Sequence, residues 1–278
     1  MYLMPYIILS IAGSDSSGGA GIQADIKTIS ALGGYAASVI TAVTAQNTIR
    51  VQSVYPIPAD VVRAQVVSVM DDLRPNGVKI GMIHDAETAH VIAECLRKYR
   101  PAYVVYDPVM ASTGGKSLMT EQAIQIIMKE LLPLCTLITP NLHEAGLLFG
   151  HSISATDGMK QAARELSYRF RTSVLIKGGH LQGDEMCDVL YERKLSNSVD
   201  TTSSSGCVLY SGPKIESRNL HGTGCTLSSA ITLFLAGGYR LDEAVCRGKN
   251  YISQAITRGK EMKIGQGSGP LWHFPLSE

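Results

Sequence analysis

Three glycine-rich segments of the chain could bind phosphate, because the backbone N–H groups of such turns converge on an anion. They are GGAG at 18–21, TGGKS at 113–117 and HGTGC at 221–225. The third runs directly into TLSSAITLFLA, an apolar sequence that predicts a helix whose dipole reinforces the turn. We therefore expect Gly222, Thr223, Gly224 and Cys225 to form an anion hole for a phosphoryl group in transfer. An ordinary glycine-rich helix start would give the same sequence, so other residues are needed to distinguish an anion hole from such a start.

The other two glycine-rich segments fit phosphate binding less well. The first contains G-x-G-x-x-A (Gly19, Gly21, Ala24) between a predicted strand and helix, as a dinucleotide site does, but the second strand, SVITAVTAQNT, ends without the acidic residue such a site needs. The second ends in G-K-S like a Walker A loop, but Met110 stands where the first glycine belongs. A polar loop is the better interpretation of that segment.

Polar residues follow several predicted strands at their carboxyl ends, where ligands bind in open α/β sheets. Asn141 and Glu144 follow the strand CTLIT, and an N-x-x-E pair there can orient Mg²⁺ and its waters. The same pair can cap a helix, and the two roles are compatible. Lys177 and Asp107 end two further strands. One such residue alone would be an ordinary surface charge, but several together indicate a site.

The elements that must position these residues alternate along the chain, which predicts βαβ units and a parallel sheet covered on both faces. We expect strands at 6–12, 37–45, 78–83, 103–106, 136–139 and 173–176, and helices at 22–32, 59–73, 87–99, 121–132, 159–170, 226–236 and 242–262. Between 187 and 220, the runs CDVLY and GCVLY predict antiparallel edge strands around a flexible polar loop. No repeat or linker is visible, so we expect one domain over residues 1–278.

Composition excludes several classes of protein. The 278 residues carry 25 basic and 24 acidic side chains, without the clustered positive charge that nucleic-acid binding needs. The apolar start is short, lacks a positive flank and continues into a glycine-rich loop, so we interpret it as a buried strand. No segment has the length of a membrane span. The six cysteines are scattered without a C-x-x-C pair, which favours reduced thiols in a cytoplasm.

Eight segments in order resemble a known family and span nearly the whole chain. They are IAGSDSSGGAGIQADIKT, TAVTAQNT, KIGMI, DPVM, ITPNLHEA, IKGGH, HGTGCTLSSA and GQGSGP. Together they resemble the bacterial hydroxymethylpyrimidine/phosphomethylpyrimidine kinases of thiamin biosynthesis, members of the ribokinase-like superfamily. The resemblance implies a three-layer α/β/α fold around a mostly parallel sheet, and a homodimer. It also implies two successive ATP-dependent phosphorylations, which convert a hydroxymethylpyrimidine to its monophosphate and then to its diphosphate.

The resemblance also assigns roles to individual positions. The pyrimidine pocket would be lined by Gly13, Asp25, Gln46, Met82 and Val109. The transferring phosphate would lie on Gly222, Thr223, Gly224 and Cys225, and the nucleotide phosphates would face Lys177 and Lys249. Mg²⁺ would be organised by Asp107, Asn141 and Glu144. His143 replaces a commoner proline, and the serine-rich segment 196–205 is longer than usual.

Cys225 stands where sugar kinases of this superfamily have a general-base aspartate. A thiol at a helix N-terminus can have a lowered pKa and deprotonate an alcohol, or it can simply pack. His221 could tune that thiol or lie on the surface.

Pyridoxal or pyridoxine kinase is the nearest alternative activity, and the carboxamide of Gln46 argues against it. A catalytically silent ligand-binding sensor and a sugar or nucleoside kinase are further alternatives. The intact polar set argues against the sensor, and the missing aspartate against the sugar kinase.

Overall fold

The computed structural model describes residues 4–110, 118–179, 185–193 and 206–274. Its centre is a nine-stranded sheet in the order β3-β2-β1-β4-β5-β6-β7-β8-β9. Strands β2, β1, β4, β5, β6 and β7 are parallel, whereas β3, β8 and β9 pair antiparallel at the two edges. The strands are β1 (Ile7–Asp15), β2 (Tyr35–Gln46), β3 (Val51–Pro56), β4 (Gly77–Ile80), β5 (Val104–Tyr106), β6 (Leu137–Ile138), β7 (Ser173–Ile176), β8 (Glu185–Tyr191) and β9 (Cys207–Pro213).

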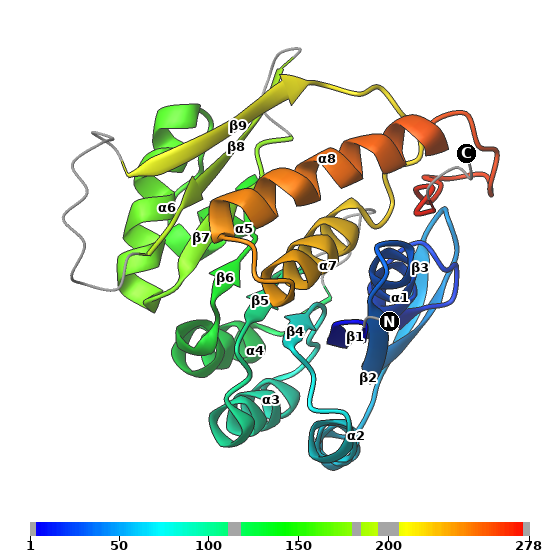
Figure 1. Ribbon diagram of the computed structural model, residues 1–278, viewed down its shortest axis with the longest axis vertical. Helices are drawn as coiled ribbons and strands as arrows, with labels where there is room; N and C mark the ends of the chain where they lie inside the picture. Colours follow the sequence, from blue (N-terminus) through cyan, green and yellow to red (C-terminus); the bar gives the residue numbers. More distant parts are fainter. Residues whose placement is uncertain (1–3, 111–117, 180–184, 194–205, 275–278) are drawn as a thin grey trace.

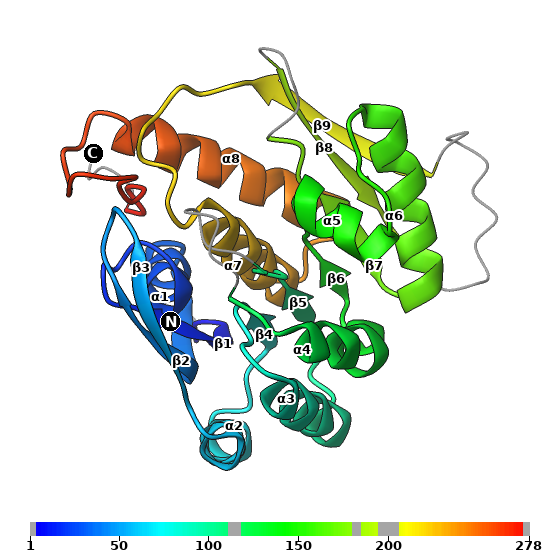
Figure 2. The same ribbon diagram turned by 180° about the vertical axis from the view of Figure 1, so that it is seen from behind.

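Helices cover both faces of the sheet (Figure 1 and Figure 2). One face carries α1 (Gly21–Ala31), α7 (Thr223–Ala236) and α8 (Leu241–Gly259). The other carries α2 (Ala59–Asp72), α3 (Ala86–Tyr99), α4 (Glu121–Ile126), α5 (Leu142–Phe149) and α6 (Thr156–Phe170). This arrangement is the predicted three-layer α/β/α fold with a mostly parallel sheet.

The central strands are buried on both faces, so their side chains alternate between two apolar cores. Val105 and Leu137 point to the core beneath α7 and α8. Val104, Tyr106 and Ile138 point to the larger core beneath α2–α6. This packing makes the strand ends a rigid base for whatever residues follow them.

Two predicted elements differ from the observed ones. The predicted helix 121–132 is interrupted: α4 is followed by a π-helical turn, Ile127–Leu131, and a 3₁₀ turn, Leu132–Leu134, in which Pro133 cannot donate an α-helical hydrogen bond. The edge strand β3 was not predicted, since its alternating residues are mostly only partly buried. The antiparallel pair predicted within 187–220 is confirmed as β8 and β9, and segments 113–117 and 196–205 lie outside the described residues.

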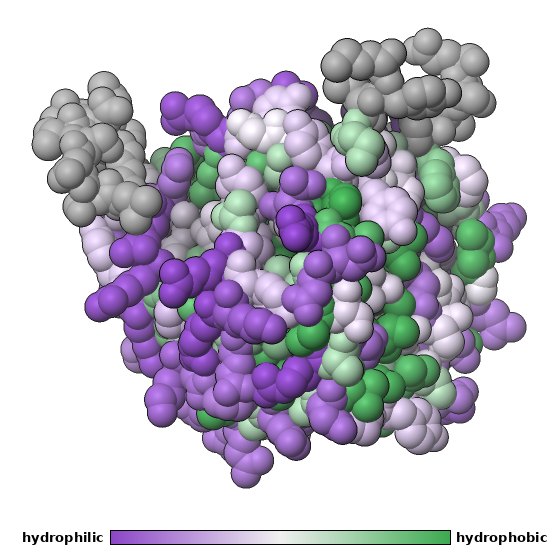
Figure 3. All heavy atoms as spheres, turned by 60° about the horizontal axis from the view of Figure 1, so that its bottom comes forward, coloured by the Kyte–Doolittle hydropathy of each residue, from purple (hydrophilic) through white to green (hydrophobic). Residues whose placement is uncertain are grey.

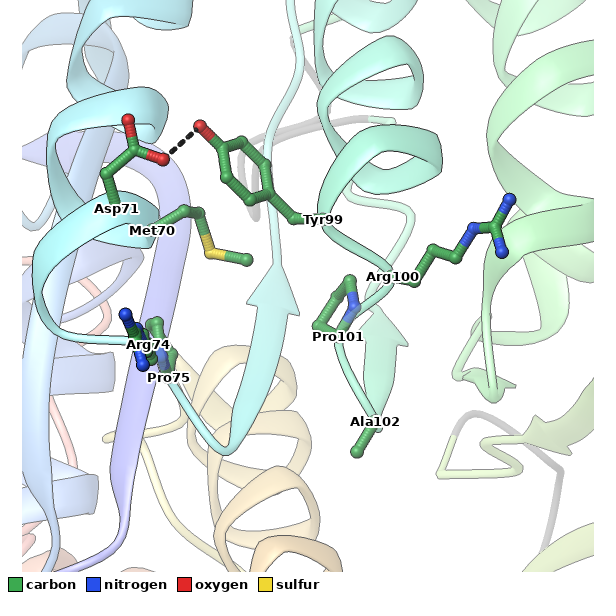
Figure 4. A pocket seen from close by; sticks show the side chains of 8 residues that line it. All are labelled: Met70, Asp71, Arg74, Pro75, Tyr99, Arg100, Pro101 and Ala102. Atoms are coloured by element: carbon green, nitrogen blue, oxygen red, sulfur yellow. Dashed lines mark hydrogen bonds between the residues drawn. The ribbon is translucent and has the colours of Figure 1, made fainter.

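An open cavity of ≈ 460 Å³ lies between the connections that precede β4 and β5, at the amino ends of the strands (Figure 4). Its lining includes Arg74, Pro75 and Pro101, and the Tyr99 hydroxyl donates to Asp71 over 2.7 Å. On the side of α2 and α3, hydrophilic and hydrophobic residues are interspersed (Figure 3). The residues singled out for chemistry follow the opposite, carboxyl ends of the strands. In the described part of the chain, no helix is both long and apolar enough to cross a membrane.

Candidate active site at the carboxyl ends of the strands

The turn before α7 leaves backbone donors available for an anion. Gly222 has φ +88°, and a Cβ there would lie 1.9 Å from the carbonyl oxygen of Gly19, so the turn requires glycine. Thr223 is engaged locally, its hydroxyl donating to the Leu220 carbonyl over 2.6 Å. Among the described residues, no acceptor is found for the N–H groups of Gly224 and Cys225 in the first turn of α7. These two donors and the helix dipole form a site that an anion can occupy.

Two of the predicted strand-end residues lie directly against this turn. The Lys177 ammonium donates to Asp107 Oδ1 over 2.6 Å, and the Thr139 hydroxyl donates to the same oxygen over 2.9 Å. A Cβ on Gly224 would lie 2.8 Å from Asp107 Oδ2 and 3.2 Å from Lys177 Nζ. The ends of β5 and β7 therefore bring a carboxylate and an ammonium group to the N-terminus of α7.

Asn141 and Glu144 form a capping box at the start of α5. Glu144 N–H donates to Asn141 Oδ1 over 2.9 Å, and Asn141 N–H donates to Glu144 Oε2 over 2.7 Å. Burial raises the pKa of Glu144, and nearby Asp107 adds to this, while Lys177 opposes both. A further cation would stabilise this buried carboxylate pair, so the residues fit Mg²⁺. Among the described residues no three His, Cys, Asp or Glu side chains form a complete metal cluster, and such a cation must take other ligands as well.

Lys249, expected to face the nucleotide phosphates, is paired in this structure with another residue. Its ammonium group pairs with Asp188 on β8, and the other oxygen of that carboxylate accepts the Gly178 N–H over 2.8 Å. A Cβ on Gly178 would lie 1.9 Å from the Cys187 carbonyl oxygen, so the chain turns tightly against β8 immediately after Lys177. In this structure Lys249 is a support for the turn that carries Lys177, and its charge is already compensated by Asp188.

Three residues predicted for the pyrimidine pocket come together beside the ends of β1 and β4. Met82 and Ala42 form a small apolar cluster with Leu118, and Val109 packs against it. A Cβ on Gly13 would lie 3.2 Å from Met82 Sδ. The sequence prediction thus selected neighbours in space, although their contact with a substrate remains a prediction.

Asp25, predicted for the same pocket, is fully buried. Its two oxygens lie 2.9 and 2.8 Å from the ammonium group of Lys79, which is itself 0% exposed. Hydroxyl groups of Ser10 and Ser229 donate to the same carboxylate. Both oxygens of Asp25 therefore have protein partners, and a contact of this side chain with substrate stays a prediction.

The first glycine-rich loop is closed around an internal anion. The carboxylate of Asp15 accepts the N–H groups of Ser17, Gly19 and Ala20 and a bond from His221 Nε2 at 2.8 Å. Burial would raise the pKa of Asp15, but the hydrogen bonds of His221 and Ser17 outweigh it and lower the pKa to about 2. The donors that could cradle a phosphate are thus used by Asp15, which argues against the dinucleotide interpretation of this loop.

The segment 264–274 completes the same end of the molecule. Gly267 N–H donates to Thr48 Oγ1 over 3.1 Å, and His221 N–H donates to the Gly269 carbonyl over 3.1 Å. His273 is buried and lies 3.0 Å from the Thr226 hydroxyl on α7. The GQGSGP motif therefore connects the β2–β3 turn with the turn before α7.

Comparison with known proteins places this site in a family. The family model described as Phosphomethylpyrimidine kinase matches residues 15–272. The chain belongs to the phosphomethylpyrimidine kinase family. A hydroxymethylpyrimidine/phosphomethylpyrimidine kinase of Rhizobium meliloti is 47% identical to this family member over 98% of both chains.

Solved structures agree with this assignment. A phosphomethylpyrimidine kinase from Clostridium difficile is 43% identical, with a TM-score of 0.77 over 90% of this chain and 99% of that one. A pyridoxal kinase from Bacillus subtilis, solved with ADP, is 33% identical, with a TM-score of 0.84 over 97% of both chains. The phosphomethylpyrimidine kinase family member thus shares its fold with kinases named for two different substrates.

Within this family member, the thiol of Cys225 does not have the lowered pKa that its helix position suggested. Burial raises the pKa to about 11, because the cost of desolvation exceeds the opposing effect of Lys79. His221 lies between Asp15 and Gln46, with Nε2 3.2 Å from the Gln46 amide, so it serves a different network from the expected one. Sequence reasoning missed Lys79, although a lysine within the buried strand GVKI already signals a buried partner.

Proposed function

We propose that the chain transfers the γ-phosphoryl group of ATP to the hydroxymethyl oxygen of 4-amino-5-hydroxymethyl-2-methylpyrimidine. A second transfer to the monophosphate gives the diphosphate used in thiamin biosynthesis. In each step the acceptor oxygen forms a bond to phosphorus, the bond to the leaving ADP oxygen breaks, and the acceptor's proton is released. The relatives named above support this reaction.

The observation that carries the proposal is that Asp107 and Lys177 lie beside the N–H groups of Gly224 and Cys225, which have no acceptor within the part of the chain that the structure describes. Phosphoryl transfer depends mainly on positioning and charge stabilisation. Each backbone donor aimed at the transferring group can contribute about 2.7–4 kcal/mol, by analogy with an oxyanion hole. With its pKa raised, Cys225 is a neutral thiol at pH 7, and it acts as a hydrogen-bonding or packing group next to the acceptor oxygen.

The proposal includes Mg²⁺ held with the nucleotide near Asp107, Asn141 and Glu144. When bound, Mg²⁺ neutralises charge on the nucleotide phosphates. Asp107, Asn141 and Glu144 would hold the ion and its water ligands; because burial and Asp107 raise the pKa of Glu144, a cation there would favour its ionised carboxylate. Lys177 and Thr139 both donate to Asp107 Oδ1, and the positive charge of Lys177 can stabilise the negative charge of the γ-phosphate.

The second candidate is a pyridoxal kinase, which the Bacillus subtilis relative favours. Gln46, at the end of β2, distinguishes the two. An aminopyrimidine offers adjacent donor and acceptor atoms that match a carboxamide, whereas pyridoxal leaves part of the amide unpaired, at a cost of about 1–3 kcal/mol. Gln46 could instead only cap the turn before Asn47, and the test below includes this outcome.

The test is a substrate panel on wild type and Gln46→Met, with hydroxymethylpyrimidine, its monophosphate, pyridoxal, pyridoxine and ribose. Wild type should phosphorylate the first two, and chromatography separates monophosphate from diphosphate. Gln46→Met should reduce kcat/KM for hydroxymethylpyrimidine about 10–100-fold while pyridoxal turnover stays level or rises. An equal loss on both substrates would assign Gln46 to the fold, and preferred turnover of pyridoxal by wild type would overturn the proposal.

We further propose that the single-domain chain works in the cytoplasm as a homodimer. On the edge hairpin β2–β3, Val43, Ile49 and Tyr55 are 41%, 57% and 62% exposed. Such a row of exposed apolar side chains on an edge hairpin favours a second copy as partner. Light scattering should give a dimer mass for wild type and a monomer mass for Tyr55→Glu, and a monomeric wild type contradicts the proposal.

A further inference from the structure

The Gln46 amide is held between two side chains whose hydrogens can be assigned. Its Nε2 is placed 3.2 Å from His221 Nε2, and its Oε1 is placed 3.2 Å from Thr44 Oγ1. His221 Nε2 also lies 2.8 Å from Asp15 Oδ2. A carboxylate only accepts hydrogen bonds, so His221 Nε2 must carry a hydrogen. A nitrogen that carries a hydrogen cannot accept a bond from the amide nitrogen of Gln46.

The other end of the amide leads to the same conclusion. Thr44 Oγ1 donates its single hydrogen to the Ser14 carbonyl over 3.0 Å. It therefore has only lone pairs to offer Gln46, and it needs a donor there. Turning the amide by 180° removes the clash between the two N–H groups: Oε1 then shares the His221 Nε2–H hydrogen with Asp15, and Nε2 donates to Thr44.

We propose that His221, fixed by Asp15, is a positioning residue that sets the orientation of the Gln46 amide and thereby the preference for an aminopyrimidine. This inference rests on the proposed function. With the inner edge of the amide committed to His221 and Thr44, one N–H and one carbonyl lone pair remain for substrate, in a fixed order. If the amide were turned the other way, its N–H would face the substrate's amino group and its carbonyl oxygen would face the ring nitrogen. Both hydrogen bonds to the substrate would then be lost.

The position of His221 is itself well determined. Its side chain is 7% exposed, and its backbone N–H is held by the Gly269 carbonyl. Asp15 in turn is held by four donors of the first glycine-rich loop, from Ser17, Gly19 and Ala20. Asp15 therefore fixes the hydrogen on His221 Nε2, and this hydrogen fixes which end of the Gln46 amide faces the imidazole.

The kinetic test uses His221→Leu, which removes the donor, and His221→Gln, which can restore one. His221→Leu should raise KM for hydroxymethylpyrimidine about tenfold, with kcat, KM for ATP and pyridoxal turnover little changed, and His221→Gln should recover most of the loss. His273→Leu is the matched control, because it removes another buried imidazole that contacts Thr226 on α7. In a Gln46→Met background, His221→Leu should have no further effect on KM.

An unchanged KM in folded His221→Leu, or an equal loss in the Gln46→Met background, would overturn the inference. A second readout does not need turnover. In wild type, nuclear Overhauser effects should connect the Gln46 Nε2 hydrogens with the Thr44 side chain, and in His221→Leu they should weaken, because Thr44 alone then orients the amide. Contacts from those hydrogens to the His221 ring would overturn the inference, even if the wild type failed to phosphorylate hydroxymethylpyrimidine and the proposed function were wrong.

Discussion

Replacing Lys79 by methionine tests the buried ion pair that lies under the site. Lys79 and Asp25 both have fully buried side chains, and Lys79 contacts both oxygens of the carboxylate at 2.9 and 2.8 Å. Burial lowers the pKa of Lys79, but Asp25 outweighs this and the pKa is raised, so the pair is charged. Lys79→Met leaves the Asp25 carboxylate buried without a cation.

The expected cost follows from what remains around Asp25. Breaking a buried pair on one side costs about 3–5 kcal/mol, and the hydroxyl donors Ser10 and Ser229 stay in place. We therefore expect Lys79→Met to lower the free energy of unfolding by about 3 kcal/mol, a large part of the roughly 5–15 kcal/mol that a domain has. Asp25→Asn combined with Lys79→Met removes the charge, keeps an acceptor for one serine hydroxyl and offers an N–H to the other, so it should recover at least half of the loss.

Urea unfolding followed by circular dichroism measures both variants. A loss below about 1 kcal/mol for Lys79→Met, or a double variant no more stable than the single one, would refute the reasoning. Activity of the folded double variant also bears on the sequence prediction for Asp25. If the carboxylate contacts the pyrimidine, KM for that substrate should rise strongly, whereas an internal role leaves KM within about threefold of wild type.

Three further outcomes are expected. Glu144→Gln should lower kcat by more than about tenfold with little change in KM for the pyrimidine, and unchanged activity across a Mg²⁺ titration would contradict the metal assignment. Cys225→Ser should keep a catalytic rate near that of wild type, because a thiol whose pKa is raised to about 11 is not a base at pH 7. The general-base hypothesis would be restored if Cys225→Ala and Cys225→Ser both lost about 10²–10⁴ in rate and Cys225→Asp recovered part of it. Burial, with a smaller effect of Lys27, lowers the pKa of His273 from 6.5 to about 4, so between these values the folded state binds fewer protons than the unfolded state. The contribution of neutral His273 to the free energy of unfolding is present above pH 6.5. It is lost as the pH falls to 4, by up to about 3 kcal/mol. The urea midpoint of wild type should therefore fall over this pH range, and the midpoint of His273→Gln should lack this part of the fall.

The sequence predicted which strand ends carry polar residues, and the reason is physical. The chain alternates apolar runs of strand length with amphipathic helices, which predicts a parallel sheet covered on both faces. The carboxyl ends of parallel strands lie at the same edge of such a sheet. Asp107, Lys177 and the turn before α7 were placed together on that basis, and the structure brings them into contact.

Pairings between distant residues could not be predicted from the sequence. Asp25 and Lys79 are separated by 54 positions, and Asp15 and His221 by 206. Neither residue periodicity nor a family resemblance predicts which charged side chains form an ion pair. Lys249 is an example, because its ion pair with Asp188 on β8 was not predicted from the sequence, and its contact with a nucleotide phosphate stays a prediction.

The contact of segment 264–274 with the turn before α7 has a consequence for the timing of folding. Synthesis proceeds from the amino end, so Asp15 and Gln46 exist long before His221, and the Gly269 carbonyl that holds His221 comes later still. A nascent chain can complete most of the sheet without possessing the arrangement around Gln46. Substrate recognition should therefore appear only after residue 269 has been made, and shorter nascent chains should not bind the pyrimidine.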